Sequence, residues 1–464
     1  MNKLFQVISI FLSVFLISAE PARAQLCETV FETITTLRPP TFGFPTVWDA
    51  KYTDLPENMV QFASGVAQDG GTVFVLGRSI SKQDYQPQNL ILAEINRRGR
   101  ALKEYKYPIK TAEQPVKLIQ LGSDFIALSN ILGGTNNDQK WARISWYSDQ
   151  GVYKREYIIK DGEFDYEGQG LLEASEGNGF IVILKAINRA DETDMNGVLL
   201  RVDKSGGVLW RRAYRPGIPN MLNSVVDIGE NSYLATGQIR LDDGRFAGWV
   251  MKLGFDGAVH WQRTYPRGKD STFLHSVWSS LWTVEGKGFL LAGQSEPLDD
   301  GPASAWIMAI DALGEPQWQR YYRRDDYALS GDWVISEDDG RIILIMKASA
   351  MEDNSGAFNH VRMLTLSPRG VMVGDEAYYV GLQATPTDYV PGWNGERILT
   401  ATITDDDAGK LDEDDEIVVI GLAADDESQI GEAKVAKDPV QKGWVFVATA
   451  LDPYDDPCLS RRNP

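Results

Sequence analysis

The chain is poor in the residues on which many catalytic sites depend. Its 464 residues include only three histidines, His260, His275 and His360, and only two cysteines. This shortage disfavours a Ser-His-Asp triad and a histidine-rich metal site. Glycoside cleavage needs only two carboxylates at a set separation, so it stays open in a chain with 65 acidic residues.

Positive charge is also scarce. The chain has 46 Lys and Arg residues against 65 Asp and Glu residues, a formal net charge of -19. Nucleic acids and anionic membrane surfaces are bound through basic patches, so this balance argues against both. It allows cationic partners or calcium. Charge that merely keeps an exported protein soluble would produce the same balance.

Long apolar runs are missing beyond the N-terminus. Lys3, an apolar run over residues 4–17 and the Ala22-Arg23-Ala24 segment together predict a secretory signal peptide over residues 1–24. No later segment approaches the roughly 20 apolar residues that a membrane span needs. We therefore expect residues 25–464 to be a single exported domain, periplasmic or extracellular, without a membrane span.

The two cysteines, Cys27 and Cys458, lie near opposite ends of this mature chain. In an exported protein, that placement predicts one disulfide bond that ties the two ends together.

An apolar run recurs along the whole chain at intervals of about 53 residues, which indicates a repeat architecture. Its copies begin at Val73, Phe125, Phe180, Tyr233, Phe289, Ile342, Arg397 and Trp444. We call this run strand b and expect a strand a before it and strands c and d after it. Four antiparallel strands per repeat, without a helical period, are typical of a β-propeller blade.

Strand d carries a fixed spacing of Gly, Trp and Tyr in three copies. The three sets are Gly206, Trp210 and Tyr214; Gly257, Trp261 and Tyr265; and Gly314, Trp318 and Tyr322. Residues four apart on a strand point to the same face. We therefore expect each Trp and Tyr to pack on a neighbouring sheet.

The two ends of the chain predict how the ring closes. The run at Trp444 supplies an eighth strand b with no c or d after it, while residues 30–37 and the segment with Trp48 and Tyr52 supply an isolated c and d. Joined, they complete a split blade and leave no open sheet edge. We expect an all-β, eight-bladed β-propeller of four-stranded antiparallel blades. The Cys27–Cys458 disulfide would replace the missing loop between strands b and c of the split blade.

The end of the repeat resembles the quinoprotein (PQQ-like) propeller family. The shared pattern Asp-x-x-Gly-x-x-x-Trp occurs at Asp203, Gly206, Trp210 and at Asp311, Gly314, Trp318, with Asp256, Gly257, Trp261 as a shifted variant. The resemblance implies eight blades and a family of quinone-dependent dehydrogenases and non-catalytic assembly factors. Its catalytic members are expected to hold the quinone against a disulfide between adjacent cysteines, which this chain lacks. The resemblance therefore implies the non-catalytic branch, and no catalytic residue or quinone is carried over.

The loops between strands b and c are rich in acidic residues, and in an antiparallel blade they share one face of the ring with the d-to-a connections. One of them approximates a calcium loop of the EF-hand type, with Glu192, Asp194, Asn196 and Asp203 as candidate ligands. Another has Asp405, Asp407 and Glu416 at three of the expected spacings, but Lys410 stands where the turn needs Gly. Solvated loop charge is the alternative explanation of both.

Four tryptophans fall on or near strand a, which lines the central channel of a propeller. They are Trp278, Trp282, Trp333 and Trp393. They are candidates for stacking on a sugar or another flat ligand, and the alternative is that they simply plug the ring.

These features favour a non-catalytic binding scaffold, with a protein or glycan partner on the acidic face or at the channel mouth. Two alternatives stay open. One is a carbohydrate-active enzyme or degenerate quinoprotein with its site at the channel mouth, and the other is a structural component of an envelope or extracellular assembly.

Overall fold

The computed structural model describes most of residues 32–422, together with residues 445–447 and 452–453. The predicted signal peptide, Cys27, Cys458, Trp393 and the acidic segment from Asp405 to position 415 lie outside the described residues. The gaps within 32–422 are 43–45, 53–57, 69–71, 82–85, 97–99, 110–111, 134–137, 175–177, 218, 284–285, 338–339, 352–358, 379–382, 392–396 and 405–415.

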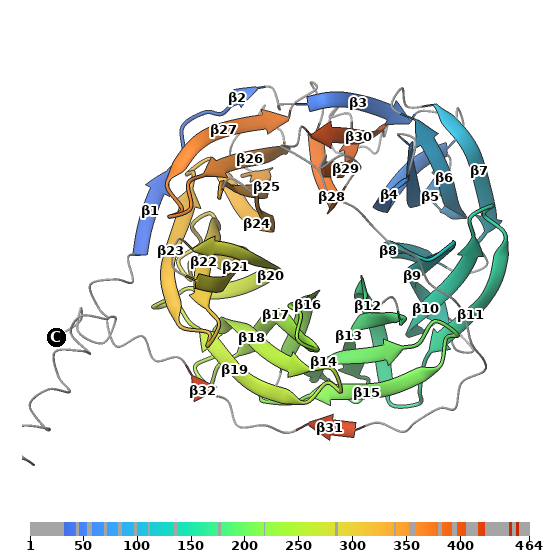
Figure 1. Cartoon of the computed structure of the whole chain (residues 1–464), viewed down its shortest axis with the longest axis horizontal. Helices are drawn as coiled ribbons and strands as arrows, with labels where there is room; N and C mark the ends of the chain where they lie inside the picture. The colour runs from blue at the N-terminus through green and yellow to red at the C-terminus, as the bar shows by residue number, and fades with distance from the viewer. Residues whose placement is uncertain are drawn as a thin grey trace, which may run out of the picture.

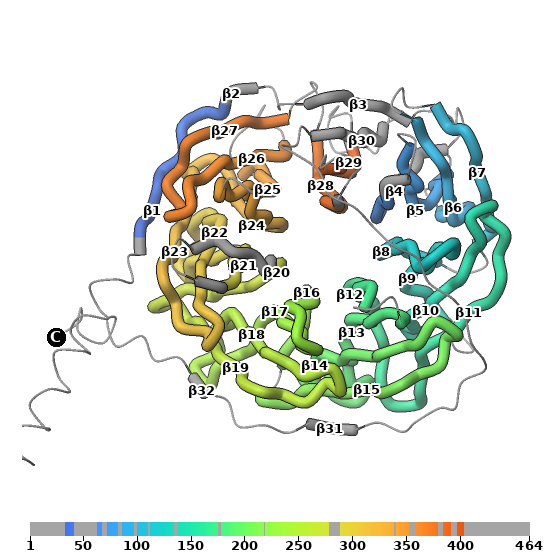
Figure 2. Tube along the Cα trace, in the orientation of Figure 1, coloured from blue at the N-terminus to red at the C-terminus, as the bar shows by residue number. Residues whose placement is uncertain are grey.

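The described strands form a β-propeller of four-stranded antiparallel blades around a central axis (Figure 1), as the sequence predicts. Seven such blades are present among the described residues, and the chain passes through them in order around the ring (Figure 2). Blades 1 to 3 contain β4 (Asn58–Gln68), β5 (Thr72–Ser81), β6 (Pro87–Asn96) and β7 (Ala101–Pro108); β8 (Glu113–Leu121), β9 (Asp124–Gly133), β10 (Gln139–Ser148) and β11 (Tyr153–Ile159); and β12 (Phe164–Glu173), β13 (Phe180–Asn188), β14 (Asp191–Val202) and β15 (Val208–Tyr214).

Blades 4 to 7 continue the same pattern, with strand a innermost and strand d outermost. They contain β16 (Asn220–Asp227), β17 (Ser232–Arg240), β18 (Phe246–Gly254) and β19 (Val259–Tyr265); β20 (Ser271–Thr283), β21 (Gly286–Glu296), β22 (Ser304–Asp311) and β23 (Pro316–Arg323); β24 (Tyr327–Ser336), β25 (Ile342–Ala350), β26 (His360–Leu366) and β27 (Met372–Tyr378); and β28 (Gln383–Pro391), β29 (Arg397–Thr404), β30 (Glu416–Leu422) and β3 (Thr46–Tyr52).

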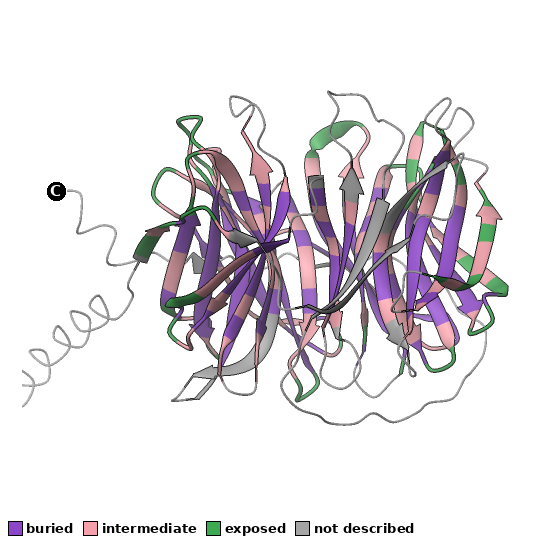
Figure 3. Ribbon diagram, turned by 90° about the horizontal axis from the view of Figure 1, so that it is seen from above, coloured by how far each residue is buried: buried purple, intermediate pink, exposed green. Residues whose placement is uncertain are grey.

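The core lies between the blades, on both faces of strands b and c. These strands are short, near-continuous apolar runs such as FIVIL from Phe180, all five residues of which are buried. Runs of this kind suit strands covered on both faces by neighbouring sheets. Figure 3 shows the result, with buried residues through the middle of the blades and exposed residues at the loops and the outer edge.

Blade 7 joins the two ends of the chain. Its strands β28, β29 and β30 come from the C-terminal part, and β3 completes it by pairing antiparallel with β30, from Thr46 opposite Leu422 to Tyr52 opposite Ile417. The prediction that the segment with Trp48 and Tyr52 forms an outer strand d of a split blade is confirmed. Its partner strands differ from the predicted ones.

The two segments expected to complete an eighth blade instead lie outside the ring. The N-terminal strand β1 (Glu32–Thr36) pairs in parallel with β23, and β31 (Val445–Val447) pairs in parallel with β15. Two shorter strands behave alike: β2 (Thr41–Phe42) pairs with β27, and β32 (Asp452–Pro453) pairs with β19. The apolar pattern identified these segments as strands but could not show that they add to the edges of complete blades.

Each of several blades is joined to the next by the Gly, Trp and Tyr of strand d. The Tyr214 hydroxyl donates to the Gly257 carbonyl of the next blade at 3.0 Å, and Tyr265 donates to Gly314 at 2.7 Å and Tyr322 to Gly370 at 2.9 Å. Tyr107 donates to Gly151 in the same way. The prediction that these side chains pack on a neighbouring sheet is confirmed.

The glycine in this joint is required for two reasons. At Gly370 the backbone has φ of 71°, which side-chain-bearing residues rarely adopt, and an added Cβ would lie 2.6 Å from Cζ3 of Trp318 in the preceding blade. Gly122, in a turn between strands a and b, has a similar φ of 63° but open space around it.

We expect Gly370→Ala to lower the free energy of unfolding by about 3 kcal/mol, because strain and the collision with Trp318 add, and Gly122→Ala by only about 1 kcal/mol. Chemical denaturation of the two variants measures the difference. Equal losses would show that the ring of Trp318 does not constrain this position.

Candidate functional site

The face that carries the b-to-c loops and d-to-a connections is predominantly acidic. Among its described residues, ten acidic side chains are exposed and five basic ones are. The acids are Asp138, Glu163, Asp191, Glu192, Asp242, Asp243, Glu296, Asp299, Asp300 and Asp325, and the bases are Lys140, Lys160, Arg240, Lys269 and Arg323. We call this surface the acidic face.

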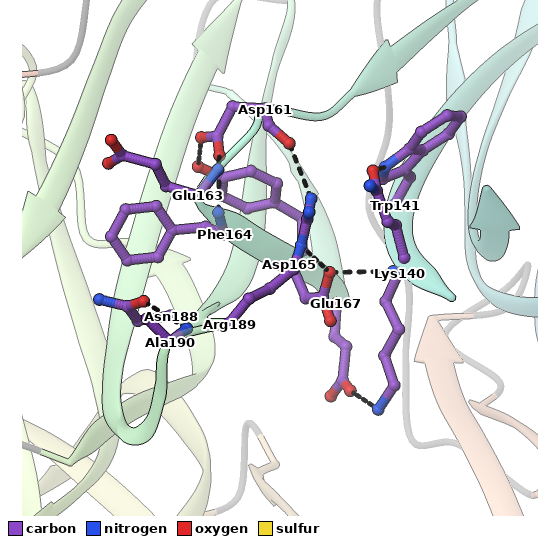
Figure 4. A network of polar contacts seen from close by, with 12 residues as sticks. Lys140, Trp141, Asp161, Glu163, Phe164, Asp165, Glu167, Asn188, Arg189 and Ala190 are labelled. Carbon is purple, nitrogen blue, oxygen red and sulfur yellow. Dashed lines mark hydrogen bonds and ion pairs between the residues drawn. The ribbon is translucent and has the colours of Figure 1, made fainter. Parts of the chain in front are cut away.

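At the junction of blades 2 and 3, a polar network stiffens the acidic face (Figure 4). Asp161 Oδ1 accepts the backbone N–H of Glu163 at 2.8 Å and that of Phe164 at 2.7 Å, and its Oδ2 accepts the Tyr166 hydroxyl. The connection into β12 is therefore held by one carboxylate. Burial, reinforced by the hydrogen bond to Asp161, raises the pKa of Tyr166, so the phenol remains a neutral donor.

The same network ties blade 2 to blade 3. Asp165 Oδ1 accepts Nε of Arg189 at 2.8 Å and the backbone N–H of Lys140 at 3.1 Å. Glu167 pairs with Lys140 at 2.6 Å and also with Lys185, and these two cations lower its pKa although burial opposes them. The carboxylates of Asp165 and Glu167 on blade 3 are thus bound by cations of both blades and by a backbone N–H of blade 2.

A cavity of about 140 Å³ opens beside this network. Buried Ala186, Val198 and Ala213 form an apolar floor, and Arg215 stands at the rim, 3.6 Å from Asp194 and 6.0 Å from the centre of the Phe164 ring. We call this cavity the blade 3 pocket. Its lining residues are Asp161, Glu163, Phe164, Tyr166, Ala186, Asn196, Val198, Ala213 and Arg215. An apolar floor with charged groups at its rim suits an amphipathic group, such as a long basic side chain or a sugar ring.

The predicted calcium ligands are not brought together. Asn196, which lines the blade 3 pocket, donates to Asp194 at 2.7 Å, whereas Glu192 is exposed at the hairpin. Asp203 follows the far end of β14, about 30 Å away along an extended strand, where it accepts Ser205 and the backbone of Gly207. Residues 191–202 form a strand rather than a calcium loop, and no group of three metal-ligating side chains occurs in the described part of the chain.

A ring of β-bulges surrounds the central channel, and the apolar pattern of the sequence does not predict it. Each of the seven innermost strands has one extra residue at the equivalent position, and all seven of these residues are partly exposed. They are Ala63, Val116, Gln169, Asn223, His275, Asp332 and Thr387. Glycines on strand b were a usable signal, because a Cβ at Gly237 or Gly293 would lie within 2 Å of a carbonyl oxygen next to the bulge.

Two charged side chains of the channel wall, Asp388 and Lys117, form an ion pair. The Asp388 carboxylate of blade 7 accepts Nζ of Lys117 from blade 2 at 2.6 and 2.7 Å, and the Ser64 hydroxyl of blade 1 at 2.5 Å. Asp388 is 4% exposed. This network connects three consecutive blades at the point where the ring closes.

His275 and Asp332 come from neighbouring blades of the same bulge ring. Burial raises the pKa of Asp332, and this outweighs the opposing effects of His275, a 2.5 Å hydrogen bond from Ser330 and the charge of Lys347. A carboxyl of this kind holds its proton at a higher pH than an exposed aspartate does.

The predicted channel tryptophans lie on the expected strands where they are described. Trp278 and Trp282 belong to β20, and Trp333 belongs to β24, where it is partly buried against the cluster between blades 6 and 7. Their stacking on a ligand stays a prediction.

No known family model matches the chain, and no curated protein matches it in sequence. Similar solved structures include a protein of unknown function from Dyadobacter fermentans, with 10% identity over 82% of this chain and 100% of that one and a TM-score of 0.45. An α-L-arabinanase of Penicillium chrysogenum in complex with arabinobiose is 12% identical, over 72% of this chain and 100% of that one, with a TM-score of 0.41. A subtype N11 neuraminidase-like protein of an influenza virus from a flat-faced bat in Peru is 10% identical, over 89% and 99%, with a TM-score of 0.43. The assignment of the fold as a β-propeller rests on the seven blades themselves. Among the described residues, no helix is long and apolar enough to cross a bilayer.

We expect Lys117→Met to lower the free energy of unfolding by about 3 kcal/mol, because it leaves the Asp388 carboxylate buried without its cation. Lys140→Met is the matched control, since Lys140 is 52% exposed and Glu167 keeps Lys185 as a partner; we expect a loss of at most about 1 kcal/mol. Urea denaturation compares them. A loss for Lys117→Met no larger than the control would show that Asp388 tolerates an unpaired charge.

We expect Asp332→Asn to gain stability relative to the parent protein as the pH rises. The pKa of Asp332 is higher in the folded protein than in the unfolded one. Its contribution to the free energy of unfolding is therefore greatest below the unfolded pKa and is lost as the pH rises through the folded pKa. The neutral amide avoids that loss. Thermal unfolding from about pH 4 to pH 8 measures the difference between the two proteins. A difference that falls with pH would contradict the assignment.

Proposed function

We propose that the protein is an exported, non-catalytic scaffold that binds a basic protein partner on its acidic face. The observation that carries this proposal is the concentration of exposed acids on one face, ten against five bases in the described residues. A face of one sign attracts partners of the opposite sign and orients them before contact.

The blade 3 pocket supplies an anchor point on that face. The alkyl stem of a lysine or arginine from the partner would pack on Ala186, Val198 and the Phe164 ring, and its charge would lie near Asp161 and Glu163. Glu163 is exposed, so its carboxylate is accessible to a ligand. The network of Asp161, Asp165 and Arg189 holds the surrounding connection in place before binding, which reduces the entropy cost of association.

The test begins with purification of the tagged protein from envelope and culture medium, followed by identification of any stoichiometric partner. With that partner, we expect the double variant Asp299→Asn/Asp300→Asn to weaken binding about tenfold at low salt and less at high salt, because the attraction is screened. Glu163→Gln should weaken it through the pocket. The matched control, Asp149→Asn/Glu230→Gln, neutralises two exposed acids in turns of the opposite face and should bind as the parent does. Equal loss in both double variants, or no dependence on salt, would reject the acidic face as the binding surface.

A carbohydrate-active enzyme is the second candidate, favoured by Asp332 on the channel wall. A carboxyl with a raised pKa is what a glycosidase uses as its general acid. Hydrolysis of a polysaccharide by the lone protein, abolished in Asp332→Asn, would favour this candidate over the scaffold.

A further inference from the structure

The two ends of the chain add strands to the outer edges of four consecutive blades (Figure 1). β31 and β32 pair with the outer strands of blades 3 and 4, and β1 and β2 pair with those of blades 5 and 6. All four pairs are parallel. No described strand pairs with the outer edge of β11 in blade 2, the next blade along this row, or with the outer edges of blades 1 and 7.

The added strands occupy the same positions on each outer strand. Counted from the glycine of the c-to-d turn, all four pair with the sixth and seventh residues. These residues are Arg212 and Ala213, Arg263 and Thr264, Arg320 and Tyr321, and Glu376 and Ala377. In blade 2 the turn glycine is Gly151, so the equivalent residues are Tyr157 and Ile158.

The backbone of the seventh residue faces outward from the blade. In blade 5, the Leu37 N–H donates at 2.9 Å to the carbonyl of Arg323, the ninth residue after Gly314. The backbone groups of a strand alternate between its two neighbours, so those of the seventh residue face the added strand as well. Ile158 is the seventh residue in blade 2. Its N–H and carbonyl therefore point away from β10, where a further strand can bond to them.

The open edge of blade 1 carries two residues that oppose strand addition. Lys106 is the seventh residue after Gly99, and its side chain is 39% exposed. Pro108, the ninth, has no N–H to donate. Lysine and proline on an edge strand are common protection against pairing with further strands. The edge of blade 1 is therefore protected.

The edge of blade 2 lacks this protection. Its seventh residue is the partly exposed Ile158, and its ninth is Lys160, whose Nζ lies 4.6 Å from the centre of the Trp141 ring. A cation at the ninth position does not prevent pairing, because blade 5 accepts β1 with Arg323 there. In the four covered blades the seventh residue is at most 4% exposed: Ala213, Thr264, Tyr321 and Ala377. An added strand would bury Ile158 in the same way.

We propose that the outer edge of blade 2 binds an extended segment of a partner protein as a strand parallel to β11. The native added strands indicate the chemistry of this segment, because β1 reads ETITT and β31 reads VFV. β-branched and aromatic residues of this kind favour the extended conformation. Main-chain hydrogen bonds supply the affinity in such strand addition. The edge lies on the circumference of the ring, so the proposal does not depend on a partner at the acidic face.

The first test uses a labelled peptide with the sequence of residues 32–37, ETITTL, and the isolated mature protein. We expect fast amide hydrogen exchange at Ile158 in the protein alone, slowed about tenfold by saturating peptide, with little change at Lys106. Absence of binding, or slowing at Lys106 instead, would overturn the proposal. Slow exchange at Ile158 without peptide would also overturn it, because another part of this chain or, where the slowing depends on protein concentration, a second copy would then cover the edge.

The second test blocks the edge. Ile158→Pro removes an outward N–H that β10 does not use, so we expect the blade to fold and the peptide to bind about tenfold more weakly. Lys106→Pro makes the same change in blade 1 and is the matched control, which should bind as the parent does. Ile158→Lys copies the blade 1 residue and should also weaken binding, even if proline disturbs the fold. Thermal unfolding monitors the fold of each variant.

Equal weakening by the two proline variants, or parent-like binding by Ile158→Lys, would overturn the assignment to blade 2. The peptide contains no basic residue, so its binding does not test the acidic face. A protein that binds the peptide but no basic partner would reject only the proposed scaffold function, and the reverse result would reject only the strand site.

Discussion

The architecture depends on a contact between consecutive blades in which a tyrosine hydroxyl donates to the carbonyl of a turn glycine. Tyr214, Tyr265 and Tyr322 make this bond across three successive junctions. Adjoining arginines, such as Arg263 on the Leu313 carbonyl, add a second bond to the same turns. Most of the remaining contact between blade faces is non-directional apolar packing, so these bonds help to fix how far each blade advances relative to the last.

How much of the fold could be predicted from the sequence depends on how far along the chain each sequence pattern extends. Strands b and the Gly-Trp-Tyr spacing are local patterns within one repeat, and the first seven strands b and all three Gly-Trp-Tyr sets correspond to observed blades. The number of blades depends on which strand accepts β3 as its partner. That partner, β30, lies some 370 residues further along the chain, at Glu416 to Leu422. Strand-like apolar segments at residues 30–37 and at Trp444 carried no information about whether they complete a blade or add to its edge.

The candidate site shows the same division. The excess of acid on one face follows from loop composition and strand topology, so sequence was enough to locate it. The blade 3 pocket was not predictable, because Phe164 on β12, Asn196 on β14 and Arg215 after β15 meet only in the folded blade. Asp194 looked like a calcium ligand by spacing, yet in the fold it pairs with Arg215 and accepts Asn196. Asn196 on the same strand and Arg215 after β15 therefore already satisfy part of the carboxylate that spacing alone would leave for a cation.

The contrast between the channel and the acidic face bears on the choice between enzyme and scaffold. In the channel, Asp388 accepts hydrogen bonds from Lys117 and Ser64, so its carboxylate already holds blades 1, 2 and 7 together. Catalysis by paired carboxylates would need a second acid there that is free to meet substrate, and Asp332 alone does not supply the pair. On the acidic face, by contrast, the carboxylates of Glu163, Asp299 and Asp300 are exposed, and Asp161 holds the connection that carries Glu163. Charge that is accessible and fixed in position can be used for recognition without any further rearrangement, which favours binding as the role of this surface.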